Sequence, residues 1–168
     1  MTRVKLWAGL SLIVVLLLAG AAVILARTSV HQPIAFNHRV HLKDAGMACP
    51  DCHVHALDGV RATIPNVEVC TPCHDKAQGH SAAEAAVVEH VRSGQPIPWR
   101  KVYQVPDHVY FSHRRHTTLG KIECETCHGR IGDRTQPVAR QLVPVAMDRC
   151  VGCHIEKGAM NDCVGCHR

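Results

Sequence analysis

One short pattern occurs five times in this 168-residue chain and uses every cysteine that the chain has. Each copy reads Cys-x-x-Cys-His, and the copies begin at Cys49, Cys70, Cys124, Cys150 and Cys163. The pattern places two thiols three positions apart and an imidazole directly after the second. The fold of this chain must therefore bring two thiols and one imidazole together for the same chemistry at five places.

Covalent haem attachment is the chemistry that needs this spacing. The two thiols can form thioethers with the two vinyl groups of one porphyrin, and the following imidazole then lies under the ring and faces the iron. We therefore predict five covalently bound haem c groups. The predicted thioether residues are Cys49, Cys52, Cys70, Cys73, Cys124, Cys127, Cys150, Cys153, Cys163 and Cys166, and the predicted proximal iron ligands are His53, His74, His128, His154 and His167.

Three other uses of the cysteines explain less of the pattern. Disulfides would account for an even number of cysteines, but not for a histidine after every second one. Zinc sites combine pairs of Cys-x-x-Cys units, and five units do not divide into pairs. Thioredoxin-like redox motifs occur singly on a βαβ frame, of which the sequence has no sign.

The composition indicates that something other than side chains fills much of the interior. Aromatic residues make up only 4% of the chain, whereas globular domains usually bury many of them. Five haems leave roughly 28 residues of chain for each, too few for a large core. We expect a multihaem cytochrome c fold, mostly irregular, with short α-helices packed around five haems. The net charge of +5 does not indicate nucleic-acid binding, because basic runs and stacking aromatics are missing.

A second pattern reveals a duplication. The sequences "FNHRVH" and "FSHRRH" each precede a Cys-x-x-Cys-His motif at the same distance, and the second copy lies 75 residues after the first. Internal repeats usually mean repeated supersecondary units. We therefore divide the haem domain, residues 28–168, into two modules at about 36–94 and 111–168, with the fifth motif as a C-terminal addition.

Each iron also has a sixth position, and nine histidines outside the motifs could fill it. We predict His38, His41, His113 and His116 as distal ligands, since they recur at a fixed distance from an attachment motif. His108 is a further candidate. His90 is either a core residue or a ligand, and Met147 either packs or provides a thioether ligand that would raise the potential of its haem. We expect His31 and His80 to be solvated.

Between the two modules we expect one helix and a linker. Ser81 and Glu84 match a capping box, and Gly94 is a suitable stop, so a helix is predicted over 81–94. Ala83, Ala86, Val87, His90 and Val91 share one face of it. The segment that follows contains three prolines and cannot continue the helix.

The N-terminus predicts a membrane anchor over residues 1–27. The run from Leu6 to Ala26 is uncharged and, at about 1.5 Å per residue, long enough for a hydrocarbon core of about 30 Å. A signal peptide cleaved near Ala21 and a buried core helix are the alternatives. Arg3 and Lys5 before the run predict that the haem domain lies on the periplasmic side of the cytoplasmic membrane.

The two His-rich turns and the motifs after them resemble the class III multihaem cytochromes c. This resemblance implies that His38 and His113 ligate the nearest haem, whereas His41 and His116 reach other haems. The anchor, the five motifs and "PIPWRKVYQVPDHVYFSHRRH" resemble the pentahaem subunit of alternative complex III quinol oxidoreductases. That resemblance implies an electron-transfer subunit, not an enzyme, with membrane-embedded quinol-oxidising and iron–sulfur subunits as partners and a soluble cytochrome c or an oxidase as acceptor.

Two other functions stay open. A stand-alone membrane-anchored quinol dehydrogenase would feed a periplasmic reductase without further subunits. A catalytic multihaem reductase would need one iron with an open sixth position, which the supply of histidines does not favour.

Overall fold

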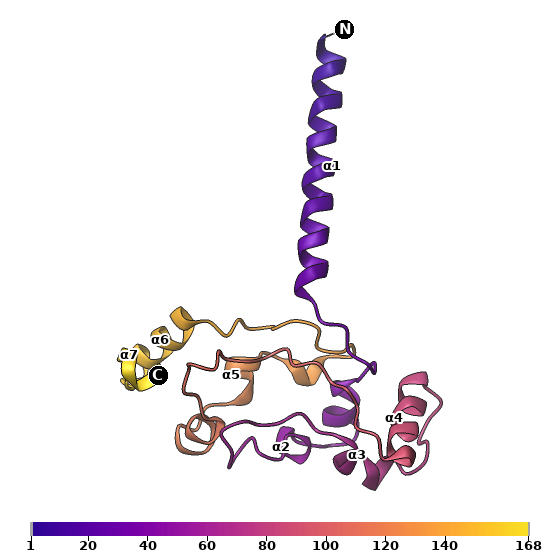
Figure 1. The fold of residues 1–168 in the computed structure, drawn as a ribbon, viewed down its shortest axis with the longest axis vertical. Helices are drawn as coiled ribbons and strands as arrows, with labels where there is room; N and C mark the ends of the chain where they lie inside the picture. Colours follow the sequence, from indigo (N-terminus) through magenta and orange to yellow (C-terminus); the bar gives the residue numbers. More distant parts are fainter. Residues whose placement is uncertain (1, 168) are drawn as a thin grey trace. The chain divides into compact units, whose positions relative to one another are not determined.

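The computed structural model describes residues 2–167, although in the first helix the side chains of residues 2–6, 8, 22 and 24–28 are not described. The chain divides into two compact units, Met1–His31 and Gln32–Arg168 (Figure 1).

The first unit contains a single helix, α1 (Thr2–Thr28). Its described apolar side chains, such as those of Leu12 and Leu17, are exposed. No helix is long and apolar enough to cross a membrane among the residues that the structure describes. The predicted transmembrane anchor is therefore not supported by those residues. Both ends of the predicted span, with Arg3, Lys5 and Arg27, lie outside the described side chains.

The second unit consists of short helices joined by long irregular segments, and its described residues form no strand beyond one isolated bridge between Val109 and His167. Its elements are η1 (Val40–Asp44), α2 (Cys49–Cys52), α3 (Val67–His74), α4 (Ala82–Ser93), η2 (Arg115–Leu119), α5 (Cys124–His128), η3 (Ile131–Asp133), α6 (Met147–Glu156) and α7 (Cys163–Cys166). The predicted mostly irregular architecture with short helices is confirmed at this level.

The two predicted modules share a local structure. The π-helical turns η1 and η2 lie 75 residues apart, as do their sequences. Each turn closes with a hydrogen bond of 2.9 Å from the residue after it, Ala45 N to Val40 O and Gly120 N to Arg115 O. The repeated sequence therefore folds twice into the same turn.

Helices α3 and α4 pack on one another and form the main side-chain core. Ile34, Val67, Val87 and Ile97 are buried there, and Ala83, Ala86, Val91 and Trp99 pack against them. Helix α4 begins after Ser81, whose hydroxyl accepts from Glu84 N at 3.1 Å, and ends at Gly94, whose φ of 65° suits glycine. The predicted helix over 81–94 is confirmed.

Half of the predicted capping box is wrong. The Glu84 carboxylate does not return to the N-terminus of its own helix, but accepts from Gln78 N and Gly79 N at 2.5 and 2.8 Å. These two amides belong to the turn after α3. Glu84 thus ties α4 to the end of α3.

The linker is extended, as its prolines predict: no regular structure is assigned from residue 95 to 106. It is fastened by side-chain contacts with segments far away in the sequence. Asn66 accepts from Ile97 N at 2.8 Å, and Gln32 accepts from Arg100 N at 3.1 Å. These bonds hold the linker across the second unit (Figure 1).

Candidate haem-binding sites

The five motifs lie on three helices of four or five residues, α2, α5 and α7, and on two longer ones, α3 and α6. We number them in chain order: site 1 (Cys49, Cys52, His53), site 2 (Cys70, Cys73, His74), site 3 (Cys124, Cys127, His128), site 4 (Cys150, Cys153, His154) and site 5 (Cys163, Cys166, His167). A helical turn brings residues i and i+3 to one side, so both thiols of a site point the same way. No disulfide joins any of the ten cysteines in this structure.

Histidines outside the motifs face the motif histidines in pairs. The ring centroids are 6.3 Å apart for His113 and His128, whose planes differ by 5°. For His116 and His154 the distance is 6.0 Å.

Facing pairs of imidazole rings also occur in the first module and near the C-terminus. His41 lies 6.2 Å from His74, and His108 lies 5.5 Å from His167, between ring centroids. A metal–imidazole bond is about 2 Å long and the ring nitrogen lies about 1 Å from the ring centre, so two imidazoles that hold one ion from opposite sides have centroids about 6 Å apart. The spacing of the pairs matches that distance.

His38 is the candidate partner of site 1. Burial, and after it the nearby His53 and His41, together lower the pKa of His38 to about 4. Burial likewise lowers the pKa of His113 and of His128. These imidazoles are neutral at pH 7, and the neutral form is the one that binds metal.

Backbone carbonyl groups occupy one nitrogen on many of these rings. Nδ1 lies 2.8 Å from Asn37 O in His41, 2.8 Å from Ser112 O in His116 and 3.1 Å from Val60 O in His113. On the motif side, Nδ1 of His53 lies 2.7 Å from Thr63 O, and Nδ1 of His154 contacts Met160 O. A carbonyl oxygen can only accept a hydrogen bond, so each of these Nδ1 atoms is the donor and Nε2 keeps its lone pair for a metal.

A phenylalanine fixes the two histidines of each turn. Phe36 stacks on His41 with centroids 4.5 Å apart and meets His38 edge-on at 4.8 Å. Phe111 does the same for His116 and His113, at 4.7 and 4.9 Å. The shared Phe holds the two imidazoles at nearly right angles and points them to different sites.

Site 3 has a small hollow that is partly open to solvent. Its lining includes both thiols, the two facing imidazoles of His113 and His128, and the ring of Phe111. No group of three or more His, Cys, Asp or Glu side chains that could hold a metal ion occurs among the residues described. The donor set here is two thiols and a facing imidazole pair, which is the set that a covalently attached haem uses.

Two further candidates take other positions. Nδ1 of His90 lies 3.0 Å from Gln95 O, at the end of its own helix, and no described ring contact joins it to a motif histidine. Met147 is the first residue of α6, and its side chain is 68% exposed. The described side chains therefore do not bury Met147, and both alternatives for it stay predictions.

Tyr103 is a contact residue of site 3 that the sequence analysis missed. Its ring meets that of His128 edge-on with centroids 4.4 Å apart. Its hydroxyl donates to His128 O at 3.2 Å and accepts from Leu142 N at 2.7 Å. No motif marks Tyr103, because it lies in the linker and reaches the site only through the fold.

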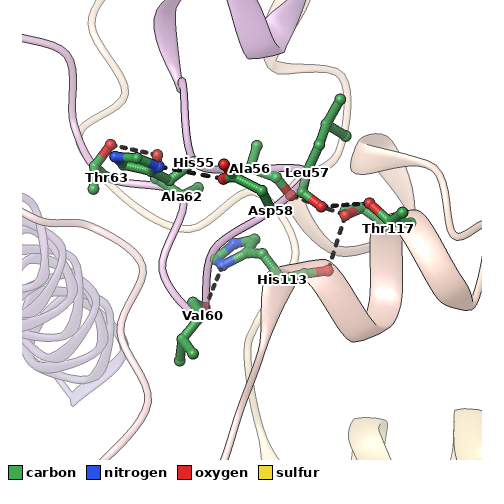
Figure 2. A network of polar contacts seen from close by, with 10 residues as sticks. His55, Ala56, Leu57, Asp58, Val60, Ala62, Thr63, His113 and Thr117 are labelled. Carbon is green, nitrogen blue, oxygen red and sulfur yellow. Dashed lines mark hydrogen bonds and ion pairs between the residues drawn. The ribbon is translucent and has the colours of Figure 1, made fainter.

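The module interface is also polar. Figure 2 shows the loop after site 1 facing the second His-rich turn: His113 Nδ1 lies beside Val60 O, and Thr117 Oγ1 donates to Ala56 O at 2.8 Å. His113 N and Arg114 N donate to Val60 O and Gly59 O, both at 3.0 Å. The loop thus fixes the position of the His113 imidazole.

Thiols of different sites are near one another. Burial raises the pKa of Cys49, Cys52, Cys127 and Cys150, and a cysteine of another site adds to the rise in each case. Those neighbours are, in the same order, Cys124, Cys73, Cys153 and Cys166.

Comparison with known proteins gives three matches. Residues 109–168 match the family described as "Cytochrome c7 and related cytochrome c". The multihaem cytochrome c subunit of menaquinone reductase from Nitratidesulfovibrio vulgaris is 42% identical over 98 residues, 58% of this chain and 45% of the relative. The multihaem cytochrome MtrA of Shewanella baltica is 30% identical over 119 residues, 70% of this chain and 27% of the relative.

The chain spans less than half the length of both curated relatives that it matches. Both relatives are multihaem cytochromes by name, and the family match covers sites 3, 4 and 5. Residues 109–168 therefore match a family of multihaem cytochromes c, and the aligned parts of the chain, 58% and 70% of it, are similar to two proteins of that kind.

Proposed function

We propose that this chain binds five haem c groups and conducts electrons between them as a subunit of a quinone-linked respiratory complex. The facing imidazole pairs are the observation that carries the proposal. Sites 2 to 5 each have a histidine from elsewhere in the chain opposite the motif histidine. His38 completes the set at site 1.

The proposed distal ligands are His38, His41, His113, His116 and His108, for sites 1, 2, 3, 4 and 5 in that order. With two imidazoles on each iron, no position is left for a substrate. Haem iron so bound supplies reversible one-electron chemistry, with a potential that the axial ligands and their surroundings set. The chain's own part is to orient several of these imidazoles through Nδ1, as at His41, His113 and His116, and to keep the sites near one another.

A role beside a quinone-reacting partner is supported by two observations. One relative is by name a menaquinone reductase subunit, and the linker sequence resembles pentahaem subunits of alternative complex III. The partners proposed are membrane-embedded quinol-oxidising and iron–sulfur subunits, with a soluble cytochrome c or an oxidase as acceptor. Co-purification from detergent-solubilised membranes tests this. A purified chain that oxidises a quinol analogue without partners would contradict it in favour of a stand-alone dehydrogenase.

The location proposed with this function is the periplasmic face of the cytoplasmic membrane. The uncharged sequence from Leu6 to Ala26 supports it, together with Arg3 and Lys5 before that run. Alkaline extraction of membranes tests it. The full chain should stay with the membranes, while a chain secreted without residues 1–27 should be released. Release of both would contradict the proposal.

Five single variants test the ligand assignment: His38→Ala, His41→Ala, His113→Ala, His116→Ala and His108→Ala. Each should convert one haem in five from low-spin to high-spin in the electron paramagnetic resonance spectrum of the oxidised protein. His80→Ala and His90→Ala are matched controls and should leave all haems low-spin. A low-spin spectrum in any of the five variants would contradict that assignment, and a high-spin haem in the unaltered protein would revive a catalytic role.

A further inference from the structure

We infer that the five sites form one row in the order 2, 1, 3, 4, 5, so that the row begins at α3 and ends at α7. This order differs from the order of the motifs in the sequence, where site 1 comes first. The inference rests on the proposed function, because a row of sites conducts electrons only if haems are bound there. Each neighbour relation has contacts of its own.

Sites 2 and 1 are neighbours through the first His-rich turn. Phe36 touches both His38 and His41. His41 faces His74 of site 2 at 6.2 Å between ring centroids, while His38 lies near His53 of site 1. One phenylalanine ring therefore separates the histidine that serves site 2 from the one that serves site 1.

Sites 1 and 3 are neighbours across the module interface. The loop after site 1 hydrogen-bonds to the second turn through Val60 O and Ala56 O (Figure 2). This holds His113, the partner of site 3, against a loop that begins at site 1. The thiols of Cys49 and Cys124 also contact one another. The structure thus joins the first site of one module to the first site of the other.

Sites 3 and 4 repeat the relation between sites 1 and 2. Phe111 touches His113, which faces site 3, and His116, which faces His154 of site 4 at 6.0 Å. The helices of the two sites are also tied directly, since the Arg149 guanidinium donates to Thr126 O at 2.9 Å. Sites 3 and 4 are therefore adjacent.

Sites 4 and 5 are joined by a short connection. After α6 the chain folds back, with Ala159 N donating to His154 O at 2.8 Å and Met160 O in contact with His154 Nδ1. The thiols of Cys150 and Cys166 are neighbours. Helix α7 is held from its other side by Tyr110 N, which donates to Cys166 O at 2.7 Å.

The exposure of the thiols fits sites 1 and 3 as inner members of the row. Both cysteines of site 1 and of site 3 are half-buried, whereas Cys73 of site 2, Cys150 of site 4 and Cys163 of site 5 are exposed. In Figure 1, α3 lies at one end of the second unit and α7 at the other. One electron would leave a site for each electron that its neighbour gains, and no bond would be made or broken. Electrons would thus enter at one of these ends and leave at the other.

Nuclear magnetic resonance of the reduced holoprotein tests the order directly. Distal variants such as His41→Met would assign the signals of individual haems. We expect through-space contacts between the haem substituents of sites 2 and 1, 1 and 3, 3 and 4, and 4 and 5. A contact between sites 2 and 3 in place of one between sites 1 and 3 would overturn the inference.

A pair of deletion variants gives a second test. Removing site 1 (Cys49→Ala with Cys52→Ala) should isolate the haem of site 2, so one haem in four should exchange electrons with the others at least tenfold more slowly after pulse reduction. Removing site 2 (Cys70→Ala with Cys73→Ala) should leave four haems that equilibrate together. The opposite pattern would overturn the order. Fewer than five haems in the unaltered protein would instead contradict the proposed function.

Discussion

The two halves of the second unit hold their chain in different ways. Among the described residues, six hydrophobic side chains are buried, and all of them lie between Ile34 and Ile97; residues 109–167 contribute none. Yet the His-rich turns of the two halves agree closely, with Phe–His distances that differ by at most 0.2 Å (4.5 against 4.7 Å). The ligand-bearing turn therefore does not depend on a side-chain core, and we attribute the interior of the second half to its haems.

Loss of the haems should have the largest effect on protection from hydrogen exchange, and the effect should differ between the two halves. In a chain produced without haem attachment, hydrogen exchange of residues 109–167 should rise to that of an unfolded chain, because no buried side chain holds them. Helix α4 should keep part of its protection through Val87 and its neighbours. Mass spectrometry of exchange measures both. Equal loss of protection in both halves would contradict the proposed difference between them.

A matched pair of valines tests the side-chain core. Val87 is 9% exposed and Val164 is 83% exposed. Val87→Ala should lower the free energy of unfolding of the α3–α4 region by about 1–3 kcal/mol, since it removes buried methyl groups. Val164→Ala should change it by less than about 0.5 kcal/mol. The denaturant dependence of hydrogen exchange measures the loss in free energy of unfolding for each variant. Equal losses for the two variants would contradict the difference between the two halves.

Tyr103→Phe should have the smallest effect, and it should fall in the second half. It removes the hydroxyl that bridges His128 O and Leu142 N, and one such bond contributes about 1 kcal/mol. Faster exchange at Leu142 with α4 unchanged is expected. A change spread over both halves would mean that the linker supports the whole unit.

Much of the site follows from local sequence, because attachment and the His-rich turn are both local. Cys-x-x-Cys-His needs one helical turn, and Phe36, His38 and His41 are fixed by contacts within six residues. The pairing of His116 with His154 and of His108 with His167 depends on how separate segments meet. Spacing along the chain does not determine such contacts.

The side-chain core was only partly predictable. The apolar face of α4 was readable from its helical period, and Ala83, Ala86, Val87 and Val91 do pack together. His90 shares that spacing, but its Nδ1 lies beside Gln95 O at the helix end. The roles of Asn66 and Tyr103 arise from the path of the linker, which three prolines describe only as non-helical.

The intact mass of the natively produced protein, measured after denaturation, tests the central claim most directly. Haem c stays attached to its cysteines under denaturing conditions, so the account predicts one species that carries five haem adducts, with no free thiol left for alkylation. A bare chain of 18.4 kDa with ten reactive thiols or five disulfides would contradict it.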